Sequence, residues 1–370
     1  MSSAAIVTTP KEFSAMDNSA LASAHRPEVP QAVHVEHPGD QVRVLPRPAG
    51  PVEQLPLVAA RLPEILLTGE DFDDIYRHVL AAPGKRVRAR LVLACATLLP
   101  DAPGDAVSPA DAVDLACAME MLHESSLIHD DICDGSLLRR DAPSVPAAFG
   151  VRQAARAGFH MAGAAMKVVA RVLADNPAMA ERITDAPGIT FADRLSELSF
   201  GQLIETLPPA VDVPALRRHY ELVAIAKTGT LFRLSCAYGG TAGGVDLDRL
   251  HALMVYADQL AMAFQIMDDV RDIEGGPGLG KDAGGDLERR VPTWPVIEWL
   301  DLREGARDLW LDPATPSETL RTDLVDSGAT KAARVVAVTA TETAADALDV
   351  FGPSPARDDL RELLRQVISR

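Results

Sequence analysis

The stretch DAVDLACAMEMLHESSLIHDDICD, residues 111–134, joins a long apolar run to three aspartates at its end. Apolar residues recur in it at three- and four-residue spacing, which predicts a helix. At about 3.6 residues per turn, Asp130 and Asp134 lie on one face of that helix, and Asp131 flanks them. Like charges at this spacing destabilise a helix. From this stretch alone, a solvent-exposed acidic face and a cation site are equally open interpretations.

A second aspartate cluster repeats the arrangement. Asp268, Asp269 and Asp272 close another apolar run, residues 253–267. Two three-aspartate clusters, each ending an apolar helix, are hard to explain as solvation alone. If they face one another across a cavity, their oxygens suit Mg²⁺, which binds a few carboxylates, waters and substrate phosphate oxygens. We therefore expect several Mg²⁺ ions per site, bridging the protein to an anionic diphosphate and stabilising its charge as it leaves.

The remaining pattern predicts one all-α domain. Alternating β-type patterns are nearly absent, and an aromatic content of 4% suits Ala- and Leu-rich helices better than a β-sandwich. Residues 1–51 are rich in Pro and Ala, so we expect a disordered N-terminal tail there and the all-α domain over residues 52–370. Helical spacing is found in residues 85–99, 109–129, 152–174, 190–206, 214–239, 247–271, 328–349 and 356–368.

Composition narrows the function. The 370 residues carry 36 Lys and Arg against 53 Asp and Glu, a net charge of −17, which disfavours general nucleic-acid binding. The four cysteines lack paired spacing and are interpreted as reduced thiols. No apolar run reaches the length of a membrane span and no secretion signal is seen, so we expect a cytoplasmic protein without a membrane span.

Cations near the aspartate clusters are needed if an anionic substrate is to bind this acidic chain. Lys85 and Arg88 lie three residues apart, on one side of the first turn of a predicted helix. The pair 139–140, both Arg, follows the first aspartate cluster, and Lys227 and Lys281 accompany the second half of the chain. Arg forks suit phosphate geometry, whereas Lys acts as a point charge. Each alone is more often a surface cation, so only the group indicates a site.

Together these residues resemble the all-trans isoprenyl (polyprenyl) diphosphate synthase family, and within it the geranylgeranyl diphosphate synthases of bacteria. The resemblance implies an all-α, isoprenoid-synthase-type helical bundle around a central cavity, usually a homodimer. The matching segments, in chain order, are Gly84–Arg88, Leu122–Asp134, Arg139-Arg140, Phe149-Gly150, Gly201-Gln202, Lys227-Thr228, Phe264–Asp272, Gly280-Lys281, Asp286-Leu287 and Thr293–Pro295.

The resemblance implies a Mg²⁺-dependent prenyltransferase that condenses isopentenyl diphosphate with allylic diphosphates. The aspartates would hold Mg²⁺ on the allylic diphosphate, and two further residues, Lys227 and Gln265, would act at the reacting centre beside Thr228. Cations that would contact the allylic diphosphate are Arg139, Lys227 and Lys281. Residues that would cradle the diphosphate of isopentenyl diphosphate are Lys85, Arg88, His123 and Arg140. Residues that would hold the metal are Asp130, Asp131, Asp134, Asp268, Asp269 and Asp272.

Several positions depart from the family's pattern. Ala89 stands where a Pro is usual, Asp141 where a Gly follows the Arg pair, and Phe159 where an Asp is usual. Val291 falls where a diphosphate-binding Lys is common, which weakens the expected allylic site unless Arg289 or Arg290 compensates.

Product length is predicted from the tunnel that the family places beneath the first aspartates. One helical turn of about 5.4 Å is close to one isoprene unit. Ser125 and Ser126, five and four residues before Asp130, are small, whereas aromatic residues there would stop the chain at C15. We therefore expect a C20 product, geranylgeranyl diphosphate. Deeper in the tunnel we expect Leu122 and Met119, with Phe159 or His160 of the next helix as a floor.

Two other functions stay open. A class I terpene cyclase could use the same scaffold, but it needs no second-substrate site and usually lacks the second aspartate motif. A weakly active partner subunit of a heteromeric synthase is kept open by Val291, although both aspartate clusters are complete. The glycine-rich run 275–281 superficially resembles a phosphate-binding loop, but Asp282 stands where a Ser or Thr is required.

Overall fold

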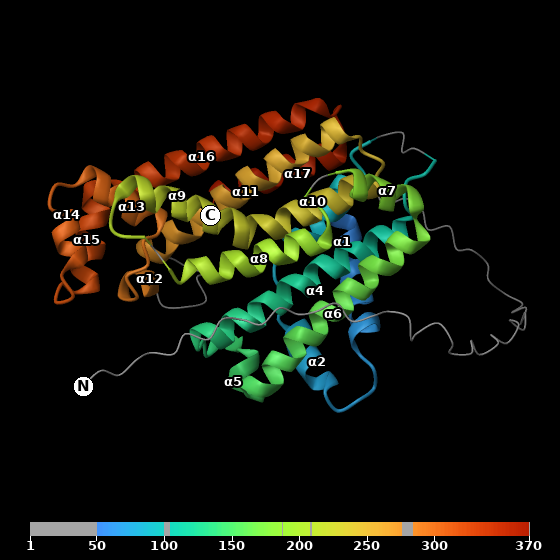
Figure 1. The fold of residues 1–370 in the computed structure, drawn as a ribbon, viewed down its shortest axis with the longest axis horizontal. Coiled ribbons are helices and arrows are strands. Elements are labelled where there is room, and N and C mark those ends of the chain that lie inside the picture. Colours follow the sequence, from blue (N-terminus) through green and yellow to red (C-terminus); the bar gives the residue numbers. More distant parts are fainter. Residues whose placement is uncertain (1–49, 100–103, 187, 208, 276–283, 370) are drawn as a thin grey trace, which may run out of the picture. The chain divides into compact units, whose positions relative to one another are not determined.

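A computed structural model describes residues 50–99, 104–186, 188–207, 209–275 and 284–369, and most of these residues are helical (Figure 1). Two-residue strands β1 and β2 pair in antiparallel register. The elements are α1 (Pro51–Leu66), α2 (Asp73–Ala81), α3 (Val87–Ala96), α4 (Pro109–Asp134), β1 (Leu138–Arg139), β2 (Ala142–Pro143), α5 (Val145–Phe149), α6 (Val151–Asp175), α7 (Pro177–Asp185), α8 (Phe191–Glu205), α9 (Val213–Val223), η2 (Ala224–Gly229), α10 (Thr230–Ala242), α11 (Leu247–Glu274), α12 (Gly285–Glu288), α13 (Trp294–Leu302), α14 (Ala306–Leu311), α15 (Ser317–Ser327), α16 (Ala329–Ala347), η3 (Leu348–Val350) and α17 (Pro355–Ile368).

The two aspartate-bearing helices, α4 and α11, have well-defined ends. Ser108 caps α4 by accepting a hydrogen bond from the backbone N–H of Asp111, and Asp246 caps α11 in the same way. Both helices end at a glycine with positive φ, Gly135 at 63° and Gly275 at 75°. Glycine adopts this left-handed conformation without steric cost, so each helix stops immediately after or shortly after its aspartates.

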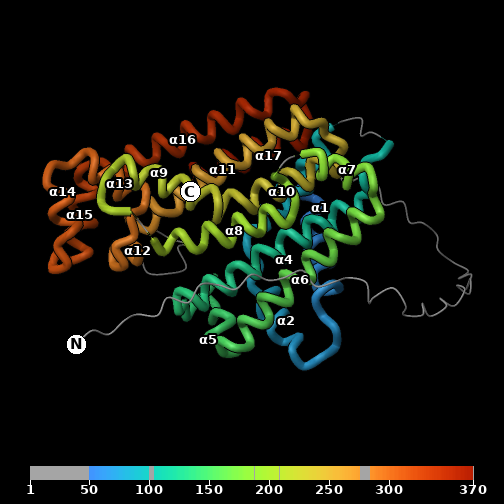
Figure 2. Tube along the Cα trace, in the orientation of Figure 1, coloured from blue at the N-terminus to red at the C-terminus, as the bar shows by residue number. Residues whose placement is uncertain are grey.

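Helix α10 lies at the centre of the bundle and is buried on nearly every side. An apolar helix without a polar face is typical of a bundle core. It packs against α3, α4 and α11, while α4 lies along α6 and α11 lies along α16 (Figures 1 and 2). Gly239 of α10 allows the close contact with α3, because a Cβ atom there would come within 2.4 Å of the Val92 carbonyl oxygen.

The all-α prediction is confirmed, and the predicted helices agree with the observed ones in most segments. The run 214–239 differs, because it is divided into α9, the π-helix η2 and α10. The strands β1 and β2 were not predicted. None of the helices in the described segments has the length and apolarity that crossing a membrane requires. The predicted tail lies outside the described residues up to position 49.

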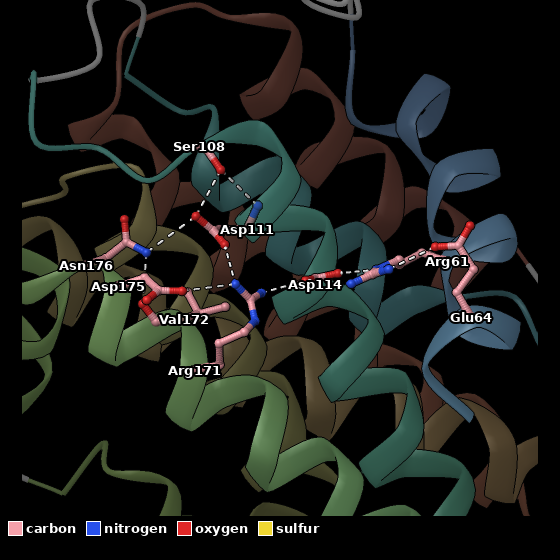
Figure 3. Close-up of polar contacts among 9 residues, drawn as sticks. All are labelled: Arg61, Glu64, Ser108, Asp111, Asp114, Arg171, Val172, Asp175 and Asn176. Carbon is pink, nitrogen blue, oxygen red and sulfur yellow. Dashed lines mark hydrogen bonds and ion pairs between the residues drawn. The ribbon is translucent and has the colours of Figure 1, made fainter. Parts of the chain in front are cut away.

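An ion-pair network ties α1 and α6 to the N-terminal half of α4 (Figure 3). The Asp114 carboxylate accepts hydrogen bonds from Arg61 Nε at 2.7 Å and from Arg171 Nη2 at 2.5 Å. Arg171 also contacts Asp111 and Asp175, both at 3.2 Å. The Asp114 side chain is 10% exposed, whereas the two arginines are 41% and 44% exposed. Asp114 is therefore the buried centre of a partly solvated network.

We expect Asp114→Asn to lower the free energy of unfolding by about 1–2 kcal/mol, because it leaves two arginines without their shared charge. The value lies below the roughly 3–5 kcal/mol of a fully buried pair because solvent screens both arginines. Urea denaturation measures the change. Glu64→Gln is the matched control, since Glu64 contacts only the outer side of Arg61 and is 63% exposed. Equal stability of Asp114→Asn and the wild type would contradict a stabilising role for the network.

Candidate active site

A cavity of about 940 Å³ opens where the middle of α4 and the C-terminal part of α11 meet the N-terminus of α3. Its wall combines carboxylates and cations, with few apolar side chains. Because α10 packs against all three helices, the bundle core fixes the positions of these wall residues. The lining residues include Lys85, Arg86, Arg88, Glu120, His123, Arg139, Arg140, Phe264, Gln265, Asp268, Asp269, Arg271, Asp272 and Asp286.

The first aspartate cluster is paired with cations and an amide. Asp131 is buried and accepts a hydrogen bond from Arg139 Nε at 3.0 Å. Burial raises the pKa of Asp131, and the Arg139 guanidinium opposes that shift. Asp130 accepts a hydrogen bond from the Gln202 side chain and lies 3.8 Å from Lys227 Nζ, whereas Asp134 is exposed. On the helix face that the two residues share, the Asp130 carboxylate is therefore hydrogen-bonded, whereas the Asp134 carboxylate is exposed to solvent.

In the second cluster, Asp269 is buried and already engaged. It accepts hydrogen bonds from the Tyr220 hydroxyl at 2.6 Å and from Gln265 Nε2 at 3.1 Å. Burial raises the pKa of Asp269 to about 8, with a further contribution from nearby Asp286, while the two hydrogen bonds oppose the shift. Asp269 thus connects α9 and α11 within the cavity wall.

The other members of the second cluster differ in exposure. Asp272 is buried and accepts a hydrogen bond from the backbone N–H of Asp286 at 3.1 Å. Asp268 is exposed and pairs with Arg271 at 3.2 Å. All three carboxylates of this cluster line the cavity.

The π-helix η2 carries Lys227 and Thr228. A π-turn adds a residue to the helical repeat and often marks a functional site. Lys227 Nζ lies 2.7 Å from Glu205 and reaches toward Asp130, while the Thr228 hydroxyl donates to Gln265 Oε1 at 3.1 Å. The element therefore connects the first aspartate cluster to Gln265 beside the second.

The cationic wall contains a half-buried arginine, Arg88, which feels the charges of Glu120 and Glu124 without pairing with either. Arg88 makes no hydrogen bond or ion pair with the described residues, its Nε is buried, and its guanidinium lies 5.0 Å from the centroid of the Phe232 ring. Burial lowers the pKa of Arg88 to about 10. Burial and the nearby arginines likewise hold the pKa of His123 well below its usual range. An anion that bound here would relieve the desolvation of both groups.

The structure brings one part of the predicted residues to the wall of the large cavity and places the first aspartate cluster beside it. Residues that line the cavity are Lys85, Arg88, His123, Arg139, Arg140, Gln265, Asp268, Asp269 and Asp272. Asp130, Asp131, Lys227 and Thr228 join them through the contacts above, and Asp134 follows one turn beyond Asp130. Lys281 lies outside the described residues. Reasoning from sequence missed Gln202, Glu205 and Tyr220; Gln202 falls in a segment that matches the family, but Tyr220 carried no signal.

Two predictions about neighbouring residues are wrong. Phe159 is 80% exposed, and His160 is also exposed and bonds the Tyr76 hydroxyl at 2.6 Å, so neither forms the floor of an internal tunnel in this chain. Arg290 does not replace the missing lysine at Val291, because its guanidinium donates to three carbonyl oxygens, the shortest bond being 2.7 Å to Thr315. Arg289 donates to Asp286 in the cavity wall at 2.7 Å and is the remaining candidate.

The other proposed chain-length positions lie in or beside the bundle core. Ser125 donates its hydroxyl to the Gly158 carbonyl at 2.8 Å, and half-buried Ser126 donates to the carbonyl of His123. Met119 and Leu122 are buried in the main core cluster.

Comparison with known proteins assigns the family. The polyprenyl synthetase profile matches residues 70–323. The large subunit of a heterodimeric geranylgeranyl pyrophosphate synthase from Arabidopsis thaliana is 32% identical over 230 residues, covering 61% of this chain and 60% of that protein. A nonaprenyl diphosphate synthase from Mycobacterium tuberculosis is 30% identical over 246 residues, covering 66% of this chain and 68% of that protein.

The solved structures agree. A polyprenyl synthase from Caulobacter crescentus, crystallised with calcium and isoprenyl diphosphate, is 25% identical to this chain and has a TM-score of 0.74. The superposition covers 88% of this chain and 99% of that protein. The chain therefore belongs to the polyprenyl synthetase family.

Proposed function

We propose that this protein is a prenyltransferase that condenses isopentenyl diphosphate with allylic diphosphates and releases geranylgeranyl diphosphate. The observation that carries the proposal is Arg88, a half-buried guanidinium that forms no hydrogen bond or ion pair with the described residues, beside His123 in a cavity whose other wall holds an aspartate cluster. Such an arrangement suits two anionic groups, one bound directly by cations and one bound through metal ions.

The carboxylates are proposed to hold divalent metal ions together with substrate oxygens, since no three of the described His, Cys, Asp and Glu side chains are grouped to enclose an ion by themselves. Asp134 and Asp268 are exposed and Asp130 is half-buried, so they offer oxygens to a metal, while Asp131, Asp269 and Asp272 support them from buried positions. We propose Mg²⁺, which takes hard oxygen ligands and keeps positions for water and phosphate oxygens. When bound, the metal would stabilise the negative charge of the departing diphosphate.

The side chains of the site are proposed to bind two different substrates. Lys85, Arg88, His123 and Arg140 would bind the diphosphate of isopentenyl diphosphate. Arg139 and Lys227, with Lys281, would bind the allylic diphosphate. Its C–O bond breaks to give an allylic cation, the alkene of isopentenyl diphosphate attacks that cation, and loss of a proton gives a longer allylic diphosphate. Gln265, held by Thr228, would orient the reacting groups.

The experiment is a Mg²⁺-dependent assay with isopentenyl diphosphate and, separately, C5, C10 and C15 allylic diphosphates, with products separated by length. We expect C20 diphosphate. Hydrocarbon or alcohol formed from an allylic substrate alone would instead establish a cyclase. No turnover by the pure protein would favour a partner subunit, for which Val291 in place of the expected lysine is the supporting feature.

The proposed product length depends on the small residues before Asp130. Sequence identity does not decide it, because a geranylgeranyl and a nonaprenyl diphosphate synthase are about equally identical to this chain. We expect Ser126→Phe to shorten the main product from C20 to C15, because an aromatic ring one turn below Asp130 would fill the tunnel. Product chromatography measures the shift, and Ser126→Ala, which keeps the position small, should retain C20. An unchanged product from Ser126→Phe would contradict the assignment, and Leu122 or Met119 would be the next positions to vary.

We further propose a homodimer formed by α6 and α8. An apolar groove of about 540 Å³ runs between these helices and includes Met166, Leu173 and Leu195. Phe200 and Leu203 of α8 are 49% and 63% exposed, which adds apolar surface suited to a second copy. Light scattering after size exclusion is expected to give twice the 39.5 kDa chain mass, and a monomer at micromolar concentration would contradict the proposal.

A further inference from the structure

Two arginines of the cavity wall have an unusual backbone. Arg86 has φ of 54° and Arg140 has φ of 52°, both in the left-handed region. Residues with a Cβ atom pay a steric penalty there, and such conformations persist only where surrounding contacts hold them. Both arginines belong to segments that carry predicted diphosphate ligands, so their conformation affects where those ligands point.

Each of these arginines is held by a buried glutamate of α4. Glu120 is 2% exposed and lies 3.5 Å from Arg86, and Glu124 is 8% exposed and accepts a hydrogen bond from Arg140 Nη1 at 2.9 Å. The two glutamates are four residues apart, so they lie on one face of the helix. One helix face therefore restrains two separate segments of the cavity wall.

Glu120 also completes the start of α3. Its Oε1 accepts a hydrogen bond from the backbone N–H of Ala89 at 2.9 Å, in the first turn of that helix, where Arg86 provides no side-chain cap. The proline that the family usually has at position 89 could not donate this bond. In this chain the carboxylate thereby fixes the turn that carries Arg88.

Glu124 fixes one edge of Arg140. Arg140 Nη1 donates both to Glu124 and to the Ala82 carbonyl oxygen, the latter at 2.7 Å. The guanidinium also lies against Gly84, where a Cβ atom would come within 2.7 Å of Nη2. Nε and Nη2 make no hydrogen bond to the described residues, and Arg140 lines the cavity. One edge is thus held by the protein while the other remains available to an anion.

Glu124 itself does not line the large cavity. It borders instead a pocket of about 30 Å³ behind Arg139 and Arg140, space for one water molecule. Burial raises the pKa of Glu124, and the neighbouring Arg140 opposes the shift. The hydrogen bond of Glu124 reaches the cavity wall through Arg140, while its charge also acts on Arg88 and Arg86.

We propose that Glu124 is a positioning residue for the homoallylic substrate: it holds Arg140 in its left-handed conformation with Nε and Nη2 directed to the diphosphate of isopentenyl diphosphate. The inference rests on the proposed function, because it assigns the ligand of Arg140. Glu120 acts in parallel on Arg86 and the first turn of α3. A positioning role predicts that geometry, more than the charge of the glutamate, determines affinity.

The test compares Glu124→Ala, which removes the acceptor, with Glu124→Gln, which keeps an acceptor oxygen and nearly the same volume. Isothermal titration with isopentenyl diphosphate in metal-free buffer gives Kd, and steady-state assays give KM for each substrate. We expect Glu124→Ala to raise Kd and KM for isopentenyl diphosphate about 10–30-fold, the effect of losing one charge-assisted hydrogen bond. KM for the allylic diphosphate should stay within about twofold, and Glu124→Gln should restore Kd to within about threefold of the wild type.

Asp114→Asn is the matched control, because it removes a buried, arginine-paired carboxylate from the other end of the same helix. It should lower stability without changing either KM. A wild-type Kd in Glu124→Ala, or an equal loss in Glu124→Gln and Glu124→Ala, would overturn the positioning role. Equal changes in both KM values would overturn it as well, by showing a general structural defect. If the wild type neither binds nor consumes isopentenyl diphosphate, the proposed function fails first, and the inference falls with it.

Discussion

Asp130→Asn is expected to lower kcat by about 10³-fold, equivalent to about 4 kcal/mol of transition-state stabilisation. Asp130 lies at the end of α4, where it accepts a hydrogen bond from Gln202 and faces Lys227 at 3.8 Å. The amide keeps the shape of the side chain but removes the charge that would hold a divalent metal against the allylic diphosphate. KM for isopentenyl diphosphate should change less than about threefold, because the groups proposed to bind that substrate lie at and before the start of α3, in the middle of α4 and in the β1–β2 turn.

The measurement is kcat as a function of Mg²⁺ concentration, together with thermal denaturation with and without Mg²⁺ and inorganic diphosphate. The wild type should be stabilised by this pair of ligands, and Asp130→Asn should lose most of that stabilisation. Asp248→Asn, an exposed carboxylate in the first turn of α11, is the control and should behave as the wild type. If kcat of Asp130→Asn lay within tenfold of the wild-type value, Asp130 would not be a metal ligand.

The sequence alone was sufficient for the helices and the aspartate clusters because both depend on local spacing. Apolar periodicity alone placed α4 and α11 within a few residues of their observed bounds. The interpretation of the clusters needed the resemblance, since spacing alone cannot distinguish an acidic surface from a metal site.

Other features depended on contacts between residues far apart in sequence. The π-helix η2 lies within a stretch whose apolar spacing predicts one continuous helix. Nothing in residues 224–229 indicates the extra residue in its turn. The Tyr220–Asp269 hydrogen bond joins residues 49 positions apart, and the outward direction of Phe159 depends on which face of α6 packs on α4. Nothing in the sequence singled out Glu124 within its matching segment. Its partner Arg140 lies 16 positions further along the chain, and the β1–β2 turn brings the two side chains together.

Arg88→Met is expected to raise KM for isopentenyl diphosphate about 10²-fold and, at the same time, to leave the protein as stable as the wild type or about 1 kcal/mol more stable. The first effect follows from removing a guanidinium proposed to bind a diphosphate. The second follows because desolvation of a guanidinium that forms no ion pair with the described residues costs free energy in the absence of ligand. That desolvation lowers the pKa of Arg88 to about 10 despite the charges of Glu120 and Glu124. Methionine keeps an unbranched side chain against Phe232.

Arg90→Met supplies the opposite case two residues further along α3. Arg90 forms a two-point ion pair with Asp359 of α17, with N–O distances of 2.8 and 2.7 Å, and does not line the cavity. Its loss should destabilise the protein by about 1–3 kcal/mol and leave KM for both substrates unchanged. Urea denaturation of the ligand-free proteins and steady-state kinetics measure the two effects. If Arg88→Met instead lowered stability as Arg90→Met does and left KM unchanged, Arg88 would be a structural residue. The proposed function would then lack its main supporting observation.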